Sequence, residues 1–330
     1  MYATSDKQRG GLLVAVITGG RPKLSERPTR KFFQQLHDAG VHDIVWVVSE
    51  KDAPHYERDD NELAVYPMEW AEKYASEHWM NPKPYESGSF FGAFVGREWA
   101  CLEAERRGCW GVMQLDDNII STTAVAQDSA GEATLRVHGG MGFIVDVLAG
   151  VALSTNGKTV GAQLTSVITN QAKVSRPGFP YSCFIERVGD GREHWYGPFE
   201  DDITHAFQYG TRADSSTSLV VPMLRYRKES KSKSGMRSKY NHERAVQLQR
   251  IFPESAKVVA KSTKSNGVRG DGMARVFHQM QAGAIRNPQV ILDRELYGKV
   301  RDRVTMIVRE RGELAVQVNR KKMRKRAAEG

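Results

Sequence analysis

The chain has 330 residues, of which 40% are hydrophobic and 26% are charged, and it contains three cysteines and a net charge of +9. This composition excludes a disordered or fibrous chain and is sufficient for a buried core without disulfides. Three cysteines cannot all pair with one another, and no apolar run approaches the roughly 18 residues of a membrane-spanning helix. We therefore expect a cytoplasmic protein with no membrane span.

Positive and negative charges are unevenly distributed along the chain. Residues 211–330 hold 28 Lys and Arg against 11 Asp and Glu, a net charge of +17, whereas residues 1–210 have a net charge of −8. An acidic region followed by a basic one favours chemistry in the first and binding of a polyanion by the second. A basic tail that only keeps the protein soluble is the alternative interpretation.

Strand and helix patterns alternate over residues 11–120. Continuous apolar runs predict four buried strands, and apolar residues at helical spacing predict three helices. The strands are expected at 11–17, 43–48, 63–66 and 111–115, and the helices at 27–39, 70–79 and 95–107. This alternation predicts an α/β fold with a doubly wound, Rossmann-like and mostly parallel sheet.

A short glycine loop follows the first predicted strand, in the stretch Thr18-Gly19-Gly20-Arg21. Glycines at this point let a ligand approach the backbone closely, and Arg21 can contact a phosphate or a base. The loop has neither the GxGxxG pattern nor the Gly-Lys-Ser/Thr of a P-loop, which excludes P-loop phosphoryl transfer. A plain strand–helix turn is the alternative.

Two more residues extend this candidate site. Ser49 ends the second predicted strand, and Arg97 lies in the first turn of the helix at 95–107. A cation there opposes the helix dipole unless it faces an anion, so Arg97 is a candidate for contact with a diphosphate or a nucleobase. A solvated arginine is the alternative.

Two carboxylates and an amide follow the fourth predicted strand, in Asp116-Asp117-Asn118. Open α/β sheets bind ligands at the carboxyl ends of their strands. Clustered oxygen ligands suit Mg²⁺ or Mn²⁺ carrying a phosphate. The tripeptide is therefore a candidate site for a divalent metal and a diphosphate, with an exposed Asp-Asn turn as the alternative.

The pattern changes after the fourth strand. Residues 121–138 are small and polar, and 141–153 form an apolar helical run. The segments 159–173 and 179–188 are rich in β-branched and aromatic residues, which favour strands. Together with a late strand at 219–224 they predict a mixed or antiparallel subsheet.

A second acidic cluster, Glu200-Asp201-Asp202, follows Pro198. Proline and carboxylates suit the N-terminus of a helix, which is the structural alternative. Three consecutive acidic residues exceed what capping requires, so we predict that this cluster supplies a general base.

The rest of the chain is basic. We predict a Ser-rich flexible loop at 225–240 that binds a donor phosphate or a nucleic-acid backbone. Its first basic residues are Arg225, Arg227, Lys228, Lys231 and Lys233. Helical patterns at 241–252, 273–284 and 292–318 then predict a mainly helical extension.

The two acidic clusters together fit sugar transfer from a nucleotide donor. A metal at residues 116–118 would neutralise the leaving nucleoside diphosphate, and the cluster at 200–202 would deprotonate an acceptor hydroxyl. Glycoside hydrolysis also uses two carboxylates, but it needs neither the glycine loop nor the basic region. We divide the chain into a catalytic domain at 1–225, with a donor half at 11–120 and an acceptor half at 121–225, and an extension at 226–330.

This order of elements resembles the GT-A glycosyltransferases over roughly residues 11–225. In that family a helix rich in arginine and small residues precedes a strand that ends in a DxD metal motif. Here these are Gly96-Arg97-Glu98-Trp99-Ala100 and Asp116-Asp117-Asn118, in which Asn118 departs from the family's second Asp.

A second motif supports the resemblance. The stretch Trp195 to Ile203 is similar to the Trp-Gly-Gly-Glu-Asp-Asp stretch of galactosyltransferase-like members, which implies that Asp201 is the base, supported by Glu200 and Asp202. The resemblance implies Mg²⁺ or Mn²⁺ on Asp116, Asp117 and Asn118. It implies donor contacts from Thr18, Gly19, Gly20, Arg21, Ser49, Arg97 and Asp116. Acceptor or phosphate contacts are expected from Trp195, Arg225, Arg227, Lys228, Lys231 and Lys233.

The basic third points to the acceptor. GT-A enzymes of phages and kinetoplastids that glycosylate hydroxymethylated pyrimidines in DNA combine such a core with a basic surface, and this chain is similar in its charge distribution. The similarity implies a UDP-sugar donor, DNA as partner and a bacterial or phage-infected cell. The alternatives are a glycan, lipid or protein acceptor, and a nucleic-acid-binding protein without catalysis. Nothing in the sequence indicates an obligate protein partner.

Overall fold

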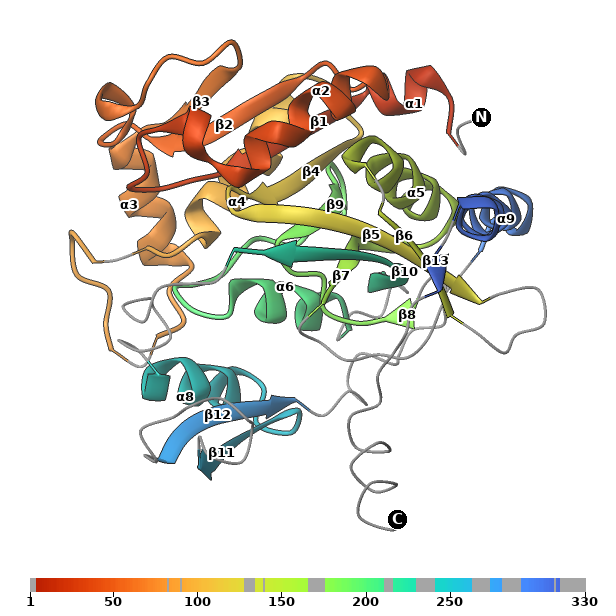
Figure 1. Cartoon of the computed structure of the whole chain (residues 1–330). Helices are drawn as coiled ribbons and strands as arrows, with labels where there is room; N and C mark the ends of the chain where they lie inside the picture. Colours follow the sequence, from red (N-terminus) through yellow and green to blue (C-terminus); the bar gives the residue numbers. More distant parts are fainter. Residues whose placement is uncertain are drawn as a thin grey trace, which may run out of the picture.

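The computed structural model describes residues 4–81, 83–89, 91–127, 134–138, 140–165, 176–210, 216–229, 241–262, 274–280, 292–311 and 313–314. Within these ranges, eleven strands form one mixed sheet that runs through the molecule (Figure 1). A separate two-stranded sheet lies beside helix α8 (Asn241–Ile251). No helix in the described part of the chain is long and apolar enough to cross a membrane.

One half of the large sheet is parallel, as predicted. Its strand order is β3-β2-β1-β4, and each neighbouring pair in this run is parallel. The bounds are β1 Leu12–Ile17, β2 Ile44–Ser49, β3 Glu62–Tyr66 and β4 Gly111–Asp116. Strands β1 and β2 are covered on both faces, which is why their sequences are continuously apolar.

The other half of the sheet is mixed, which confirms the predicted subsheet. It continues from β4 in the order β9-β7-β10-β5-β6-β13, with β8 paired to β10. All of its pairings are antiparallel except the one between β7 and β10. The bounds are β5 Ile119–Gln127, β6 Thr134–His138, β7 Gly157–Leu164, β8 Arg176–Pro177, β9 Cys183–Arg187, β10 Thr217–Lys228 and β13 Glu313–Leu314.

Helices cover both faces of the sheet. One core layer joins β1, β2 and the mixed strands to α2 (Phe33–Asp38), α5 (Met141–Ser154) and α9 (Arg294–Arg311). The other joins β1 and β2 to α3 (Met68–Glu77) and α4 (Phe94–Arg106). Helix α6 (Asp201–Gly210) packs against α8, while the short α1 (Asp6–Gly10) lies beside α5.

Helix α4 packs closely on the parallel strands because Gly96 faces them. A Cβ atom at this position would lie 3.2 Å from Ile17 Cγ2, tighter than most side-chain contacts. The absence of a side chain at Gly96 therefore lets the helix bring its neighbour Arg97 close to the carboxyl end of β4.

Four predicted segments differ from the structure. The predicted helix at 27–39 is divided into a 3₁₀ turn (Pro28–Phe32) and α2, and a second 3₁₀ turn (Leu24–Glu26) precedes it. The small polar stretch 121–138 contributes β5 and β6, because its Thr and Val residues fit a half-buried sheet. The predicted helix at 273–284 contains a strand, β12 (Ala274–Met280), which pairs with β11 (Ala256–Ser262).

The fourth difference concerns the predicted basic loop. Arg225, Arg227 and Lys228 belong to β10, which pairs with β5 through this stretch. The predicted domain boundary after residue 225 therefore falls inside a strand. Beyond it, α9 packs on α5 and β5, and β13 pairs with β6 at the sheet edge. Lys231 and Lys233 lie outside the described residues.

Candidate active site

A cavity of about 650 Å³ opens at the carboxyl ends of the parallel strands. It lies where the fold places ligands of open α/β sheets, between β1, β2, β4 and the N-terminus of α4. Eight of the predicted donor and metal residues line it together: Thr18, Gly19, Gly20, Arg21, Ser49, Asp116, Asp117 and Asn118. Tyr66, Phe91 and the backbone at Gly92 and Ala93 form other parts of its wall.

The acidic turn after β4 is held in place by Thr29 in a neighbouring 3₁₀ turn. The Thr29 hydroxyl donates to the carbonyl of Asp116 at 2.7 Å and accepts from the amide of Ile119 at 2.9 Å. The Thr29 amide donates to the carbonyl of Asp117 at 3.3 Å. These three bonds fix the backbone of the turn, so its side chains are presented in one arrangement.

Asp116 is paired with two cations. The Arg97 guanidinium donates to Asp116 Oδ1 at 3.2 Å, and the Lys228 ammonium pairs with Oδ2. Burial alone would raise the pKa of the Asp116 carboxyl, but Lys228 and Arg97 outweigh it and hold that pKa well below its usual range. Asp116 is therefore ionised throughout the physiological range.

Asp117 and Asn118 complete the turn differently. Asp117 accepts from the Thr18 hydroxyl at 2.9 Å and pairs with Arg21. Burial raises the pKa of Asp117, although Arg21 and Thr18 oppose the shift. Asn118 is 5% exposed, and its side-chain oxygen has no hydrogen-bond partner among the described residues. A buried oxygen with no hydrogen-bond partner, beside two carboxylates, is a suitable ligand for a divalent cation.

The chemistry of this oxygen set decides which metal would fit. No group of three His, Cys, Asp or Glu side chains in the described ranges is arranged to hold a metal. A cation on this turn would therefore need the amide oxygen of Asn118 as well as the two carboxylates. Such an all-oxygen set suits Mg²⁺ or Mn²⁺ rather than zinc.

Arg97 connects this turn to the second acidic cluster. Its Nε donates to Asp201 Oδ2 at 2.9 Å, while its other nitrogens reach Asp116 and Gln114. The residue is 3% exposed, and its guanidinium lies 5.4 Å from the Phe184 ring centroid and 5.3 Å from that of Trp195. The two predicted clusters thus lie on either side of one buried guanidinium.

The carboxylates of the second cluster have different surroundings. Asp201 and Asp202 begin α6, where the helix dipole stabilises negative charge. Burial and the neighbouring charge of Asp201 raise the pKa of Asp202 to about 7. Glu200 instead pairs with Arg244 of α8, so its carboxylate is directed to a different partner.

Three predicted contact residues lie outside the cavity lining. Trp195 was predicted at the acceptor, but it is 1% exposed and packs in the core, where its ring stacks on His205 at 3.8 Å. It therefore supports the floor beneath Arg97 rather than lining the cavity. On β10, Arg227 is exposed, and Arg225 is half-buried with its Nε donating to the Pro222 carbonyl at 3.3 Å. Of the described basic residues on β10, Lys228 is the one bonded to the acidic turn.

A buried polar network beneath the site was not predicted. Glu186 is fully buried in β9 and accepts from Trp195 Nε1 at 3.0 Å and from Gln114 Nε2 at 3.2 Å, while His205 Nε2 lies 2.7 Å from its other oxygen. Because His205 lies on α6, this network fixes the helix that begins with Asp201. The sequence feature that could have indicated this network is Glu186, a single acidic residue inside an apolar strand.

The entry to α6 is also joined to the segment after α3. The amide of Met80 donates to the carbonyl of Gly197 at 2.8 Å, and the amide of Gly197 donates to the carbonyl of His78 at 3.2 Å. Gly197 allows this approach, because a Cβ atom there would lie 2.0 Å from the Phe94 ring. The backbone before Asp201 is thereby attached to the segment between α3 and α4.

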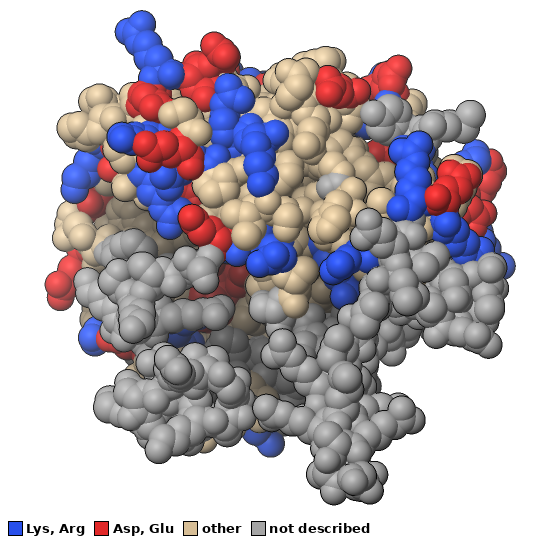
Figure 2. Space-filling model, in the orientation of Figure 1, with Lys and Arg blue, Asp and Glu red and all other residues tan. Residues whose placement is uncertain are grey.

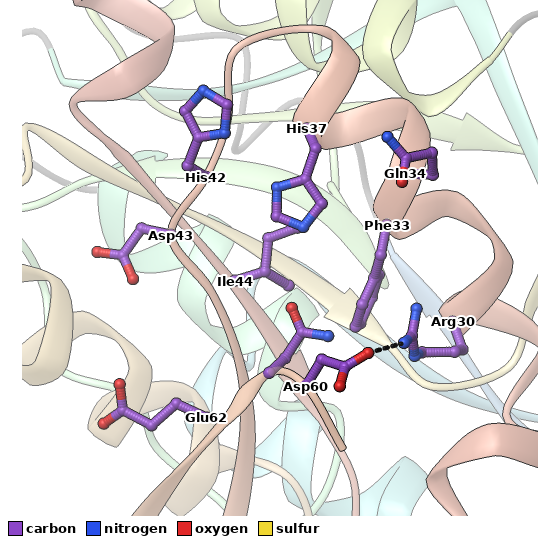
Figure 3. Close-up of a pocket in the computed structure, with 10 residues that line it drawn as sticks. Arg30, Phe33, Gln34, His37, His42, Asp43, Ile44, Asp60 and Glu62 are labelled. Atoms are coloured by element: carbon purple, nitrogen blue, oxygen red, sulfur yellow. Dashed lines mark ion pairs between the residues drawn. The ribbon is translucent and has the colours of Figure 1, made fainter.

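A second cavity lies at the opposite edge of the sheet, where β2 and β3 begin (Figure 3). Its volume is about 360 Å³, and Arg30, His37, His42, Asp60 and Glu62 are among its lining residues. Arg30 pairs with Asp60 at 3.8 Å across the rim. This cavity lies at the amino ends of the strands, which open α/β sheets do not use for ligands, and we assign no function to it.

Comparisons with known proteins find similarity only at the level of structure. No protein-family model matches the chain, and no curated protein matches it. Similar solved structures include a mycobacterial protein with a TM-score of 0.45 and 10% identity, covering 83% of this chain and 85% of that one. Glucosyl-3-phosphoglycerate synthase from Mycobacterium tuberculosis, in complex with Mg²⁺ and UDP, has a TM-score of 0.43 and 10% identity, covering 84% and 89%. The functional assignment below therefore starts from the site.

Proposed function

We propose that this protein is a glycosyltransferase that moves a sugar from a nucleoside-diphosphate donor, UDP-sugar being the form we favour, to an acceptor hydroxyl. The observation that carries the proposal is the position of Arg97. Its guanidinium joins Asp116, at the wall of a large cavity, to Asp201, at the start of α6. This contact supports a donor site on one side of the cation and a base on the other.

The cavity would hold the nucleotide. Thr18, Gly19 and Gly20 give a ligand access to the backbone after β1, and Tyr66 and Phe91 offer aromatic surface to a base. The diphosphate would lie near Arg21 and the first turn of α4, because backbone amides and the helix dipole favour an anion there. This arrangement requires no P-loop.

Asp116, Asp117 and Asn118 would hold Mg²⁺ or Mn²⁺. When bound, the divalent cation would neutralise negative charge on the leaving diphosphate. The side-chain oxygen of Asn118 supports this placement, since it is buried and has no hydrogen-bond partner among the described residues. Arg97 and Lys228 would add positive charge from the protein itself.

The pair Asp201 and Asp202 would take up the acceptor proton, with Asp201 as the proposed base. The acceptor oxygen forms a bond to the anomeric carbon as its proton passes to the carboxylate. The bond from that carbon to the diphosphate oxygen breaks, and the nucleoside diphosphate leaves with the electron pair. Because the pKa of Asp202 is raised to about 7, this pair changes its proton content near neutral pH.

For the acceptor we propose a 5-hydroxymethylpyrimidine in DNA. The net charge of +17 on residues 211–330 supports a polyanionic partner, and the hydroxymethyl group of such a base already lies in the major groove. On the face seen in Figure 2, described Lys and Arg side chains are interspersed with acidic ones. A glycan, lipid or protein acceptor is the competing class.

A thermal-shift screen tests the donor. We expect UDP with Mn²⁺ to raise the melting temperature more than UDP or Mn²⁺ alone, because both ligands bind only the folded protein. No shift with any nucleoside diphosphate would refute the transferase and favour a nucleic-acid-binding protein without catalysis. A mobility-shift assay at low salt tests the acceptor, and failure to bind duplex DNA would exclude it.

A further inference from the structure

The side chain of Lys228 contacts the acidic turn of the donor site directly. Its ammonium pairs with Asp116 Oδ2 and donates to the Ser182 hydroxyl at 2.6 Å. The backbone of β10 around Lys228 is bonded to the end of the acidic turn. Lys228 pairs with Ile119 in the β-ladder, and the amide of Glu229 donates to the Asn118 carbonyl at 2.8 Å. The lysine is therefore held on the acidic turn by the backbone of β10.

Both oxygens of Asp116 are occupied by cations of the chain. Arg97 takes Oδ1 and Lys228 takes Oδ2. A divalent cation that uses Asp116 as a ligand must replace one of them or share its oxygen at a repulsive distance. At a separation of about 4 Å, two positive groups repel each other by several kcal/mol even when the effective dielectric constant is about 20.

Of the two cations, Lys228 is the one able to leave. Arg97 is 3% exposed and also bonded to Asp201 and Gln114, and its planar guanidinium is enclosed by aromatic rings. The Lys228 side chain is 15% exposed, and its ammonium is carried on a flexible four-carbon stem. Displacement therefore costs less at Lys228 than at Arg97.

We propose that Lys228 is an internal cation that competes with the divalent metal for Asp116, so that the protein binds metal weakly by itself and tightly together with a nucleoside diphosphate. The inference rests on the proposed function, because a donor diphosphate supplies the new partner for the displaced ammonium. Lys228 is thus a positioning residue that links metal binding to donor binding. It keeps Asp116 charge-compensated until both ligands are present.

The affinity for Mn²⁺ in the absence of nucleotide tests the proposed competition directly. Mn²⁺ affinity is measured by electron paramagnetic resonance for the wild type, Lys228→Met and Lys228→Arg. We expect Lys228→Met to bind Mn²⁺ about tenfold more tightly or better, because a repelling unit charge has been removed. Lys228→Arg keeps the charge and should bind as weakly as the wild type. The matched control is Arg227→Met, which removes an exposed charge from the same strand.

A second titration is made in the presence of UDP. Wild-type affinity for Mn²⁺ should rise with UDP, and that gain should be much smaller in Lys228→Met. Equal or weaker Mn²⁺ binding by folded Lys228→Met, verified by its thermal transition, would overturn the proposal, as would equal tightening in Lys228→Arg. If UDP binds to no variant, the transferase assignment fails, and the titration with Mn²⁺ alone still decides the role of Lys228.

Discussion

The two acidic clusters of the site have opposite electrostatic surroundings. At the carboxyl end of β4, Asp116 is paired with Arg97 and Lys228, and its pKa is held well below the usual range. At the start of α6, Asp202 is buried beside the charge of Asp201, and its pKa is raised to about 7. The two clusters, which Arg97 joins through Asp116 and Asp201, thus contain carboxylates with different protonation states.

This difference indicates that the two clusters have different roles. A carboxylate that stays ionised suits a cation or a diphosphate–metal complex, whereas one that titrates near neutrality suits proton transfer. Substitutions in the two clusters should therefore separate donor binding from turnover.

The largest effect is expected for Asp201→Asn. Removing the proposed base should lower transfer by roughly 10²- to 10⁴-fold, because the acceptor hydroxyl loses its proton acceptor. The thermal shift with UDP and Mn²⁺ should remain, since the donor cavity is unchanged. Turnover is measured by release of UDP, with the exposed Asp302→Asn as control. Near-normal turnover would remove Asp201 from the mechanism.

Arg97→Met should abolish the connection between the clusters. It leaves Asp116 and Asp201 without their shared buried cation, and we expect a loss of about 3–5 kcal/mol in the free energy of unfolding. Chemical denaturation measures this loss. Arg301→Met, which removes an exposed arginine from α9, is the control. A loss equal to that of the control would show that Arg97 does not hold the clusters together.

The pH dependence of kcat/KM should reflect ionisation in the second acidic cluster alone. Below a pH of about 7, kcat/KM should fall by about tenfold per pH unit as Asp202 takes up a proton. Since the pKa of this carboxyl is higher in the folded protein, its ionisation opposes folding, and its contribution to stability decreases as pH rises from the unfolded value through 7. Asp202→Asn should remove the fall in kcat/KM below pH 7. A kinetic half-point near pH 4 would contradict the assignment.

A smaller effect is expected at Asn118. Asn118→Ala removes one oxygen from the proposed metal ligands, and Mn²⁺-dependent binding of UDP should weaken on the order of tenfold. The stability without ligands should not fall, because the lost oxygen has no partner among the described residues. Calorimetric titration of UDP with and without Mn²⁺ measures the change. Equal weakening in both titrations would exclude Asn118 as a metal ligand.

Much of the donor half could be predicted because its signals are local. The apolar runs of β1, β2 and β4 require burial on both faces, and the polar residues after them necessarily meet at one sheet edge. The acidic motif at the end of the fourth strand was located in this way. Helix α6 was likewise predicted from Pro198 and the acidic residues that follow it.

The partners of these residues could not be predicted, because they depend on long-range packing. The order β4-β9-β7-β10 places Ser182 and Lys228 beside Asp116, although Lys228 is 112 residues away in the chain. The aromatic character of Trp195 suggested a contact surface, whereas its burial beneath Arg97 makes it part of the core. Segment 273–284 has apolar residues that fit a helix, but pairing with β11 decides its conformation.

The backbone bonds between Met80 and Gly197 have a consequence for local unfolding. They join the segment that follows α3 to the segment that leads into α6, over 100 residues later in sequence. Neither segment can separate from the other without breaking these bonds and exposing Phe94. Amide hydrogens on both should therefore exchange with solvent in one cooperative opening, so that the wall of the donor cavity and the start of α6 behave as a single unit of stability.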